Sequence, residues 1–148
     1  MNLIKITLFF IFINCLWGCQ QGTKGIQIKD INNLNPHSKE LTTHFDDLVG
    51  FESIQNKSNY RFVEEPNSKQ SYVEGEGQDA EGNHVIFRSN CTTDQSGEYL
   101  VLVMGSTGES CSGNNCSKCS FAIEGGCNCN KTAPPNEGSA YCNHTIAK

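Results

Sequence analysis

Six cysteines fall within residues 111–142 of this chain, and this concentration restricts how its C-terminal part can fold. In an oxidising compartment, cysteines at such density usually pair as disulfides, whereas in the cytosol they usually bind a metal. A loop-rich segment of this size buries little apolar surface of its own, so cross-links or a metal must supply part of its stability. The compartment in which the chain folds therefore decides the chemistry of these thiols.

Seven cysteines are the candidate disulfide residues. They are Cys91, Cys111, Cys116, Cys119, Cys127, Cys129 and Cys142. A bond between Cys127 and Cys129 would strain disulfide geometry because the ring is so small, so each is expected to pair with a more distant cysteine. Closing a loop of about 15 residues contributes ~3 kcal/mol. The sequence does not choose among the many pairings, and Cys91 is expected to be free or to displace one of the other six.

A metal site is the alternative for the same segment, because its thiolates and one imidazole are spaced for chelation. The candidate ligands are Cys111, Cys116, Cys119, Cys127, Cys129, Cys142 and His144. Four such groups complete a tetrahedral zinc site, and thiolates also suit copper. If disulfides form, no cofactor is expected.

The three cysteines at the start of this segment have a further possible use. Cys111, Cys116 and Cys119 follow a Cys-x4-Cys-x2-Cys spacing, which resembles the cluster loop of plant-type [2Fe–2S] ferredoxins. The resemblance covers nine residues. It implies an iron–sulfur cluster whose fourth ligand is Cys127, Cys129 or Cys142.

The Cys116-Ser117-Lys118-Cys119 motif also raises the possibility of thiol–disulfide exchange. Catalytic thiols of that kind usually lie at a helix N-terminus, where the helix dipole lowers the pKa of the first cysteine. Here strand-like residues follow, and Gly125-Gly126 ends the segment before a helix can begin. A structural role for the motif is therefore favoured.

The N-terminal 18 residues have the three parts of an export signal. Lys5 is the positive residue, Ile6 to Trp17 form an apolar core that is too short to span a membrane, and Leu16-Trp17-Gly18-Cys19 closes the segment. This closing tetrapeptide resembles the lipobox of bacterial lipoproteins, with an aliphatic residue, a small residue and an obligatory cysteine.

The resemblance implies cleavage between Gly18 and Cys19 and a diacylglyceryl thioether on the Cys19 thiol, carrying fatty acids such as palmitate. Two or three acyl chains hold a protein firmly on a membrane, since each buried methylene contributes about 0.8 kcal/mol. Gln20 is not the aspartate of the inner-membrane retention rule. The expected location is therefore the cell envelope, at the periplasmic face of the outer membrane.

Charge and motifs limit the function classes. The formal net charge of −5 argues against nucleic acid, because binding a phosphate backbone needs clustered Lys and Arg. The sequence contains no hydrolase, metalloprotease or phosphate-loop motif. The prediction is a lipid-anchored, non-enzymatic binding or structural protein. It would contact the membrane through its lipid, and its protein or ligand partner is undefined. The alternative is a metal-binding or thiol redox protein that uses residues 111–144.

The expected fold class is α+β. Residues 19–35 are polar and suit a flexible tether, in which Ile26, Ile28 and Ile31 could form a short strand. A single small domain is expected over 36–148, with one helix over 36–49, an antiparallel sheet and a loop-rich cysteine module over 111–144. The helix is indicated by Pro36 at its start and by apolar residues at helical spacing, which are Leu41, Phe45, Leu48 and Val49.

Strands are expected where short apolar or alternating runs occur. The segments are Ser71–Gly77, His84–Ser89, Tyr99–Met104, Lys118–Ile123 and Tyr141–Ala147. The first two flank a turn-rich segment and predict a hairpin, and the polar residues 52–70 read as a loop.

Overall fold

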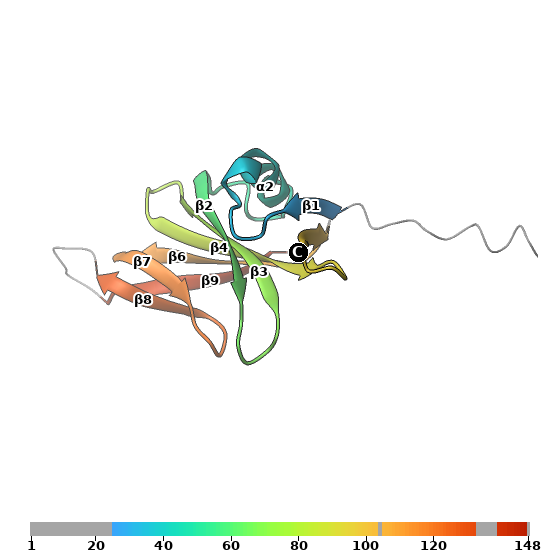
Figure 1. Cartoon of the computed structure of the whole chain (residues 1–148). Helices are drawn as coiled ribbons and strands as arrows, with labels where there is room; N and C mark the ends of the chain where they lie inside the picture. Colours follow the sequence, from blue (N-terminus) through green and yellow to red (C-terminus); the bar gives the residue numbers. More distant parts are fainter. Residues whose placement is uncertain (1–24, 104, 133–138, 148) are drawn as a thin grey trace, which may run out of the picture.

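The computed structural model describes residues 25–103, 105–132 and 139–147, and Figure 1 shows their arrangement. The elements in chain order are β1 (Gly25–Lys29), η1 (Asn35–His37), α2 (Ser38–Asp46), β2 (Gln55–Glu64), β3 (Ser71–Gln78), β4 (His84–Thr93), β5 (Tyr99–Val103), β6 (Gly108–Asn114), β7 (Cys116–Phe121), β8 (Cys127–Thr132) and β9 (Tyr141–Ala147). Seven strands form one curled antiparallel sheet, and β7 and β8 form a separate hairpin.

The long strand β4 is the centre of the sheet. One of its edges pairs with two different strands. Along its other edge it pairs with β3, from Gln78 opposite His84 to Ser71 opposite Cys91. On the shared edge its first half pairs with β6 and its last residues pair with β5. The sheet therefore forks at β4, with β5 and β1 on one branch and β6 and β9 on the other.

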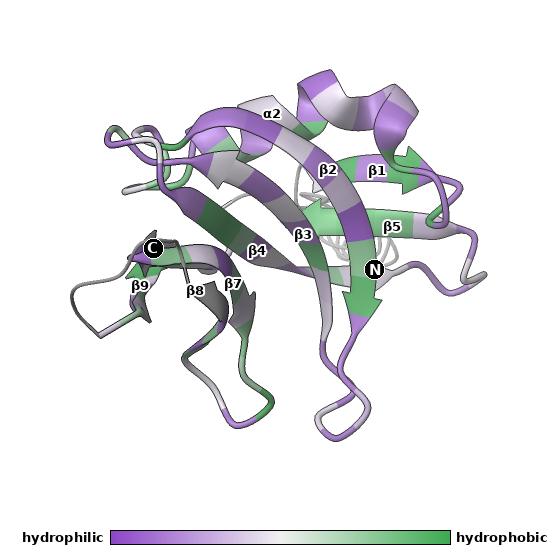
Figure 2. Cartoon of the chain, turned by 90° about the vertical axis from the view of Figure 1, so that its left-hand side faces the viewer, coloured by the Kyte–Doolittle hydropathy of each residue, from purple (hydrophilic) through white to green (hydrophobic). Residues whose placement is uncertain are grey.

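The main core lies between the sheet and helix α2. Its centre is a group of aromatic rings in which Phe45 of α2 meets Phe87 of β4 at a centroid separation of 4.7 Å. Phe51 and Tyr60 complete the group. Apolar residues concentrate in β4 and β5, as Figure 2 shows. Burial of these side chains is the main stabilisation of the helix on the sheet.

A second, smaller core lies on the opposite face of β4. Side chains alternate between the two faces of a strand, so Phe87 faces α2 whereas Ile86 faces the β7–β8 hairpin. Ile86 packs there with Cys111, Cys116 and Cys119, all buried. The helix and the hairpin therefore cover opposite faces of the sheet, and Figure 1 shows both layers.

The expected α+β class is wrong. The protein is mostly β, with one helix of nine residues against nine strands in the described part of the chain. The cysteine module is built of strands rather than loops, since β6, β7, β8 and β9 contain its six cysteines. The Gly-, Ser- and Asn-rich sequences of β6 and β8 have no apolar alternation, so no periodicity indicated these strands.

Strand β2 lies inside the segment 52–70 that was expected to be a loop. Most of its residues are exposed, and only Tyr60 is fully buried. Two register shifts against β3, around Ser58, also break the alternation that would identify a strand. Pattern alone therefore missed it.

The helix is present but shorter than 36–49. It follows a 3-10 turn that contains Pro36 and ends at Asp46. Leu41 and Phe45 are buried as predicted, whereas Val49 is 70% exposed because the helix has already ended.

Strand β1 falls within the segment expected as a tether over 19–35. It contains Ile26 and Ile28, two of the three residues that suggested a short strand there, and it pairs with β5. Residues 1–24 lie outside the described residues, so the signal segment, Gly18 and Cys19 are not described.

Candidate functional site

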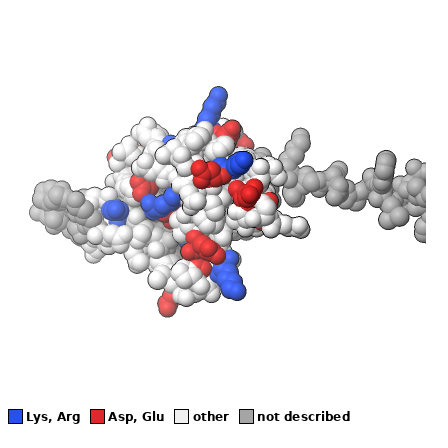
Figure 3. Space-filling view, in the orientation of Figure 1, with Lys and Arg blue, Asp and Glu red and all other residues white. Residues whose placement is uncertain are grey.

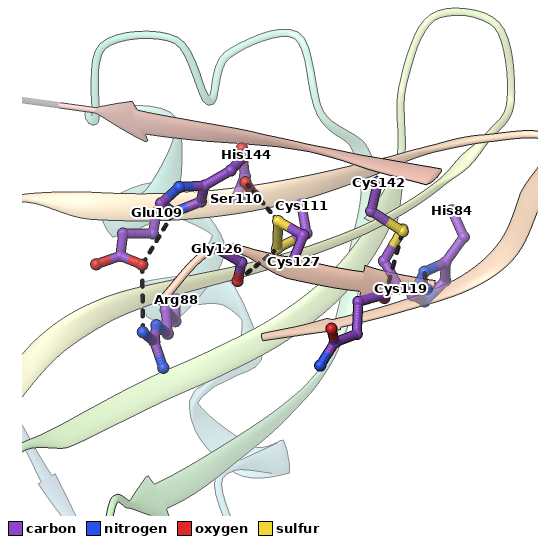
Figure 4. Close-up of a disulfide and its surroundings, with 11 residues drawn as sticks. His84, Arg88, Glu109, Ser110, Cys111, Cys119, Gly126, Cys127, Cys142 and His144 are labelled. Carbon is purple, nitrogen blue, oxygen red and sulfur yellow. Dashed lines mark hydrogen bonds and ion pairs between the residues drawn. A yellow bond between two sulfur atoms is a disulfide. The ribbon is translucent and has the colours of Figure 1, made fainter. Parts of the chain in front are cut away.

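Three disulfides fasten the cysteine module, which confirms the prediction of a disulfide framework. Cys111 of β6 bonds Cys127 of β8, Cys116 of β7 bonds Cys129 of β8, and Cys119 of β7 bonds Cys142 of β9. Cys127 and Cys129 do not bond each other; they follow one another at alternate positions of β8 and each reaches a different strand. Figure 4 shows two of the bridges from the side of β9.

The seventh candidate, Cys91, is a free thiol in β4. Its side chain belongs to the main core and is only 6% exposed. Burial raises the pKa of the Cys91 thiol to about 12, so it stays protonated at neutral pH. A protonated, inaccessible thiol is a poor nucleophile and a poor metal ligand.

Two of the disulfides lie against each other. The Sγ atoms of Cys116, Cys129 and Cys142 all lie within 4.8 Å of one another, and Cys142 is bonded to Cys119. We refer to Cys116, Cys119, Cys129 and Cys142 as the four-sulfur cluster. Its members come from three strands, and the Cys111–Cys127 bridge is not part of it.

The other candidate ligands and motifs occupy different positions. Cys111, the first residue of the ferredoxin-like spacing, lies in β6, whereas Cys116 and Cys119 lie in β7. The Cys-x2-Cys motif lies on a strand, and both of its cysteines bond partners outside it. His144 lies away from the cluster, with its Nε2 3.2 Å from Oε2 of Glu109.

A buried arginine ties the hairpin to the sheet. The guanidinium of Arg88 lies between two aromatic rings, 4.1 Å from the centroid of Tyr72 and 4.2 Å from that of Phe121. It forms ion pairs with Glu65 and Glu109. Stacking and ion pairing of this kind fix β7 over β3 and β4 without a covalent bond.

Acidic and basic side chains are interleaved elsewhere on the surface, as Figure 3 shows for one face. Lys57 bonds Asp46, and Arg61 pairs with Glu74. Such pairing leaves little continuous charge of one sign over this face.

A polar groove adjoins the four-sulfur cluster. It has a volume of about 640 Å³ and is open to solvent. It is lined by Asn56, Ser58, Asn59, Glu76, Gly77, Gln78, Gly82, Asn83, His84, Asn115, Cys116 and Ser117. We call it the amide groove, because five of these side chains end in an amide.

The groove lies where β2 departs from regular pairing with β3. The register shifts occur between Gln55 and Ser58 and between Ser58 and Arg61. Asn56 and Asn59 have left-handed backbone conformations, with φ of 53° and 54°. Bulges of this kind redirect side chains, and here they bring the two asparagines to the groove.

The wall opposite β2 is formed by the turn between β3 and β4. The Asp79 carboxylate accepts hydrogen bonds from the backbone N–H groups of Glu81 and Asn83 and from Oγ of Ser112. Burial opposes ionisation of Asp79, but the hydrogen bonds from Asn83 and Ser112 outweigh it and lower its pKa. The carboxylate thus organises a hairpin turn, and it holds Asn83 in place beside the groove.

His84 connects the groove to the cluster. Its Nδ1 accepts a hydrogen bond from the backbone N–H of Cys119 at 3.2 Å, as drawn in Figure 4. Burial lowers the pKa of His84, although Glu76 opposes this effect. A neutral ring whose Nδ1 accepts carries its proton on Nε2, so His84 can donate one hydrogen bond.

A second histidine, His44 of helix α2, is buried. His44 is 2% exposed, and its Nε2 lies 3.2 Å from Oγ of Ser89, which in turn lies 2.9 Å from Oγ of Ser106. Burial lowers the pKa of His44, with Asp47 opposing. Ser89 is 1% exposed, so this histidine–serine pair has no access for a substrate and acts within the core.

No signal in the sequence indicated the amide groove. Its residues come from β2, from β3, from the turn before β4 with the first residue of β4, and from residues 115–117 at the start of β7. Isolated asparagines are common in turns, so their presence in the sequence does not predict a binding site.

Comparison with protein-family models, with characterised proteins and with solved structures finds no significant match to this chain. Among the described residues, no helix is long and apolar enough to cross a membrane.

Proposed function

We propose that this protein is an exported binding module, anchored to the cell envelope by lipid on Cys19 and stapled by disulfides for use outside the cytoplasm. The observation that carries the proposal is the set of three disulfides that joins β6, β7, β8 and β9. Disulfides form and persist in oxidising compartments such as the bacterial periplasm and the cell surface. The second core of this protein is small and consists mainly of cysteines, so the stability of the module depends on such a compartment.

The position of the lipobox supports the anchor. Cys19 precedes the start of β1 by six residues. An extended chain of that length spans at most about 20 Å, so an acylated Cys19 would hold the domain close to the membrane surface. The proposed attachment needs no spanning helix, because two or three acyl chains are sufficient.

A binding role rather than catalysis fits the chemical groups of the described domain. The free thiol Cys91 and the histidine–serine pair His44 and Ser89 are buried, and the Cys-x2-Cys thiols are bonded elsewhere. The amide groove is lined mainly by uncharged polar side chains, together with Glu76 and His84, and amides bind ligands without reacting with them.

The test is mass spectrometry and lipid labelling of the full chain made in a bacterium that processes lipoproteins. We expect a protein that begins at Cys19 and carries acyl chains. Reduction of its three disulfides, without alkylation of the thiols, should raise its mass by six hydrogens. Labelling with a fatty acid analogue should disappear in Cys19→Ala. Cys15→Ala, which changes a cysteine within the signal segment, is the matched control and should keep the label.

An unlabelled wild type, or equal label on wild type and Cys19→Ala, would contradict the anchor. A protein recovered from the cytosol with all its thiols reduced would contradict the envelope location as well.

Metal binding by the reduced protein is a second candidate, favoured by the geometry of the four-sulfur cluster. Reduction of its two bridges by a dithiol consumes four electrons and four protons and yields four thiols, while two equivalents of dithiol become cyclic disulfides. Zn²⁺ then replaces the thiol protons, giving four thiolates around one ion. Zinc–sulfur bonds are about 2.3 Å long. The sulfurs of Cys116, Cys129 and Cys142 already lie within 4.8 Å of one another, and the fourth sulfur, that of Cys119, is bonded to Cys142.

Cobalt(II) added to the reduced protein distinguishes the two candidates. Tetrahedral thiolate ligation gives a strong charge-transfer band, which should be lost in Cys129→Ser and kept in Cys127→Ser, whose sulfur lies outside the cluster. Absence of the band, or its equal loss in both variants, would refute metal binding by these four residues.

A further inference from the structure

We infer that the amide groove is a binding site for an uncharged oligosaccharide. The inference gives a ligand class to the proposed binding role, but it does not depend on the lipid anchor. Its basis is the combination of amide side chains, one carboxylate and one imidazole around a single open groove of about 640 Å³. Ligand sites generally occupy about 300–1,000 Å³, so the size suits a short stretch of a chain ligand.

The chemical groups in the groove match hydroxyl groups. Each sugar hydroxyl both donates and accepts a hydrogen bond, and a side-chain amide offers a donor and an acceptor on one planar group. The Glu76 carboxylate can accept hydrogen bonds from two neighbouring hydroxyls. Nε2 of His84 adds a donor, because its Nδ1 is already occupied by the backbone N–H of Cys119.

Charge argues against an anionic ligand. No lysine or arginine is among the described residues that line the groove, so a phosphate, sulfate or carboxylate group would find no cationic partner among them. The carboxylate of Glu76 lies 3.7 Å from Nη1 of Arg61, which offsets part of its charge but is not among the lining residues. Large apolar side chains are also missing from that lining, which disfavours an acyl chain or an aromatic ligand. The ligand class that remains is a neutral molecule rich in hydroxyl groups, which the side chains of the groove can bind by hydrogen bonds.

The polar groups are held in place before any ligand arrives. Nδ2 of Asn59 donates to Oε2 of Glu76 at 3.2 Å, and Nδ2 of Asn56 donates to Oε1 of Gln78 at 3.0 Å. Nδ2 of Asn83 donates to Oδ2 of Asp79 at 3.0 Å. Groups that are already oriented lose less conformational freedom on binding, which favours affinity.

Three asparagines at the groove have left-handed backbone conformations. Asn56, Asn59 and Asn115 all have positive φ, at 53°, 54° and 52°, and all three side chains line the groove. Glycine adopts this conformation at lower cost than any other residue. Three asparagines at positions that suit glycine indicate that their amides are used, and strained residues of this kind gather at functional sites.

Two asparagines of the groove can be replaced by glycine to test the site. Asn59→Gly and Asn115→Gly each remove one amide from the groove and also relieve the left-handed backbone, so both proteins should fold. The matched control is Asp30→Gly, which relieves the same strain at φ of 68° in the turn after β1, away from the groove. Circular dichroism and thermal melting verify that all three are folded.

Binding is measured by isothermal titration calorimetry on the full processed protein, solubilised in a zwitterionic detergent that has no sugar headgroup. The neutral probes are chitotriose, cellotriose, maltotriose and mannotriose, and trigalacturonic acid is the anionic probe. We expect at least one neutral trisaccharide to bind. Asn59→Gly and Asn115→Gly should each weaken that binding about tenfold, the effect of one lost hydrogen bond, and Asp30→Gly should leave it unchanged.

The inference is overturned if no neutral trisaccharide binds at about 10 mM, a Kd limit that corresponds to less than 3 kcal/mol of binding free energy. It is also overturned if the two groove variants bind as well as the wild type, or if only the anionic probe binds. None of these results bears on the lipid anchor, which labelling of Cys19 tests separately.

Discussion

Gly75 of β3, which lies opposite Phe87 of β4, is an informative residue to change. A Cβ atom added there would lie 2.7 Å from Cε2 and Cζ of Phe87 and 2.9 Å from Cδ1 of Tyr60. Carbon atoms normally pack about 3.5–4.0 Å apart, so the Phe87 ring would have to move by about 1 Å. That ring is fully buried and already packs on Phe45, so it has little space into which to move.

We therefore expect Gly75→Ala to lower the free energy of unfolding by about 1–2 kcal/mol. Overpacking a dense core costs about 1–3 kcal/mol, and the lower entropy of alanine in the unfolded chain offsets about 0.5–1 kcal/mol of this. In a domain of this size the loss corresponds to a fall in Tm of about 3–10 °C.

Urea unfolding followed by circular dichroism, with the disulfides intact, measures this effect. The series is wild type, Gly75→Ala, Phe87→Leu and the double variant. Because leucine is smaller than phenylalanine, the double variant should be more stable than the sum of the single effects predicts, by about 1 kcal/mol. A Gly75→Ala protein as stable as the wild type, or purely additive effects, would refute this account of the core.

Three other predictions concern the cysteines and a buried histidine. Replacing Cys111 and Cys127 together by alanine should lower the free energy of unfolding by about 3 kcal/mol, measured by urea unfolding, because the bridge closes a loop with a sequence separation of 16; an unchanged midpoint would contradict it. The Cys91 thiol, with its pKa raised to about 12, should not react with iodoacetamide in the folded protein and should react once the protein unfolds; modification at equal rates in both states would count against the burial described. Folding lowers the pKa of His44 below 6.5, so on acidification the unfolded chain takes up a proton before the folded protein does. The free energy of unfolding should therefore fall as the pH drops below about 6.5, and it should fall less in His44→Gln. Identical pH profiles of the two proteins would exclude the histidine as the source.

Helix α2 and the hairpin of β3 and β4 were predictable because they follow strong local rules. Pro36 starts the helical segment, Leu41 and Phe45 face the core, and Gly50 has the positive φ expected where the segment ends. A short apolar run also identified β5, where the local pattern coincides with burial. Strand β9 was likewise expected at Tyr141–Ala147, although most of its residues are exposed.

The strands that the sequence did not predict are stabilised by residues distant from them in the chain. Strand β2 is a largely exposed edge whose bulges at Asn56 and Asn59 disrupt alternation. Strand β6 is held by pairing on both sides and by the Cys111–Cys127 bridge rather than by apolar side chains of its own. Such non-local support leaves no trace in a window of sequence.

The candidate site shows the same division. The density of cysteines and the expected export signal indicated a disulfide framework, and the close spacing of Cys127 and Cys129 argued against a bond between them. The partner of each cysteine, however, depends on which strands meet. The position of His144 was open for the same reason. Its Nε2 lies 3.2 Å from Glu109, which also pairs with Arg88. The amide groove needed four separate segments to converge, which no motif describes.

Strand β4 belongs to two cores that are secured in different ways. The face that carries Phe87 is maintained by packing alone, whereas the face that carries Ile86 is closed by covalent sulfur bonds. A reducing agent therefore acts on one side of the strand only. It would break the bridge that fixes Cys116, and with it the wall of the polar groove at Asn115, while the aromatic layer stays packed and Arg88 still contacts the hairpin through Phe121.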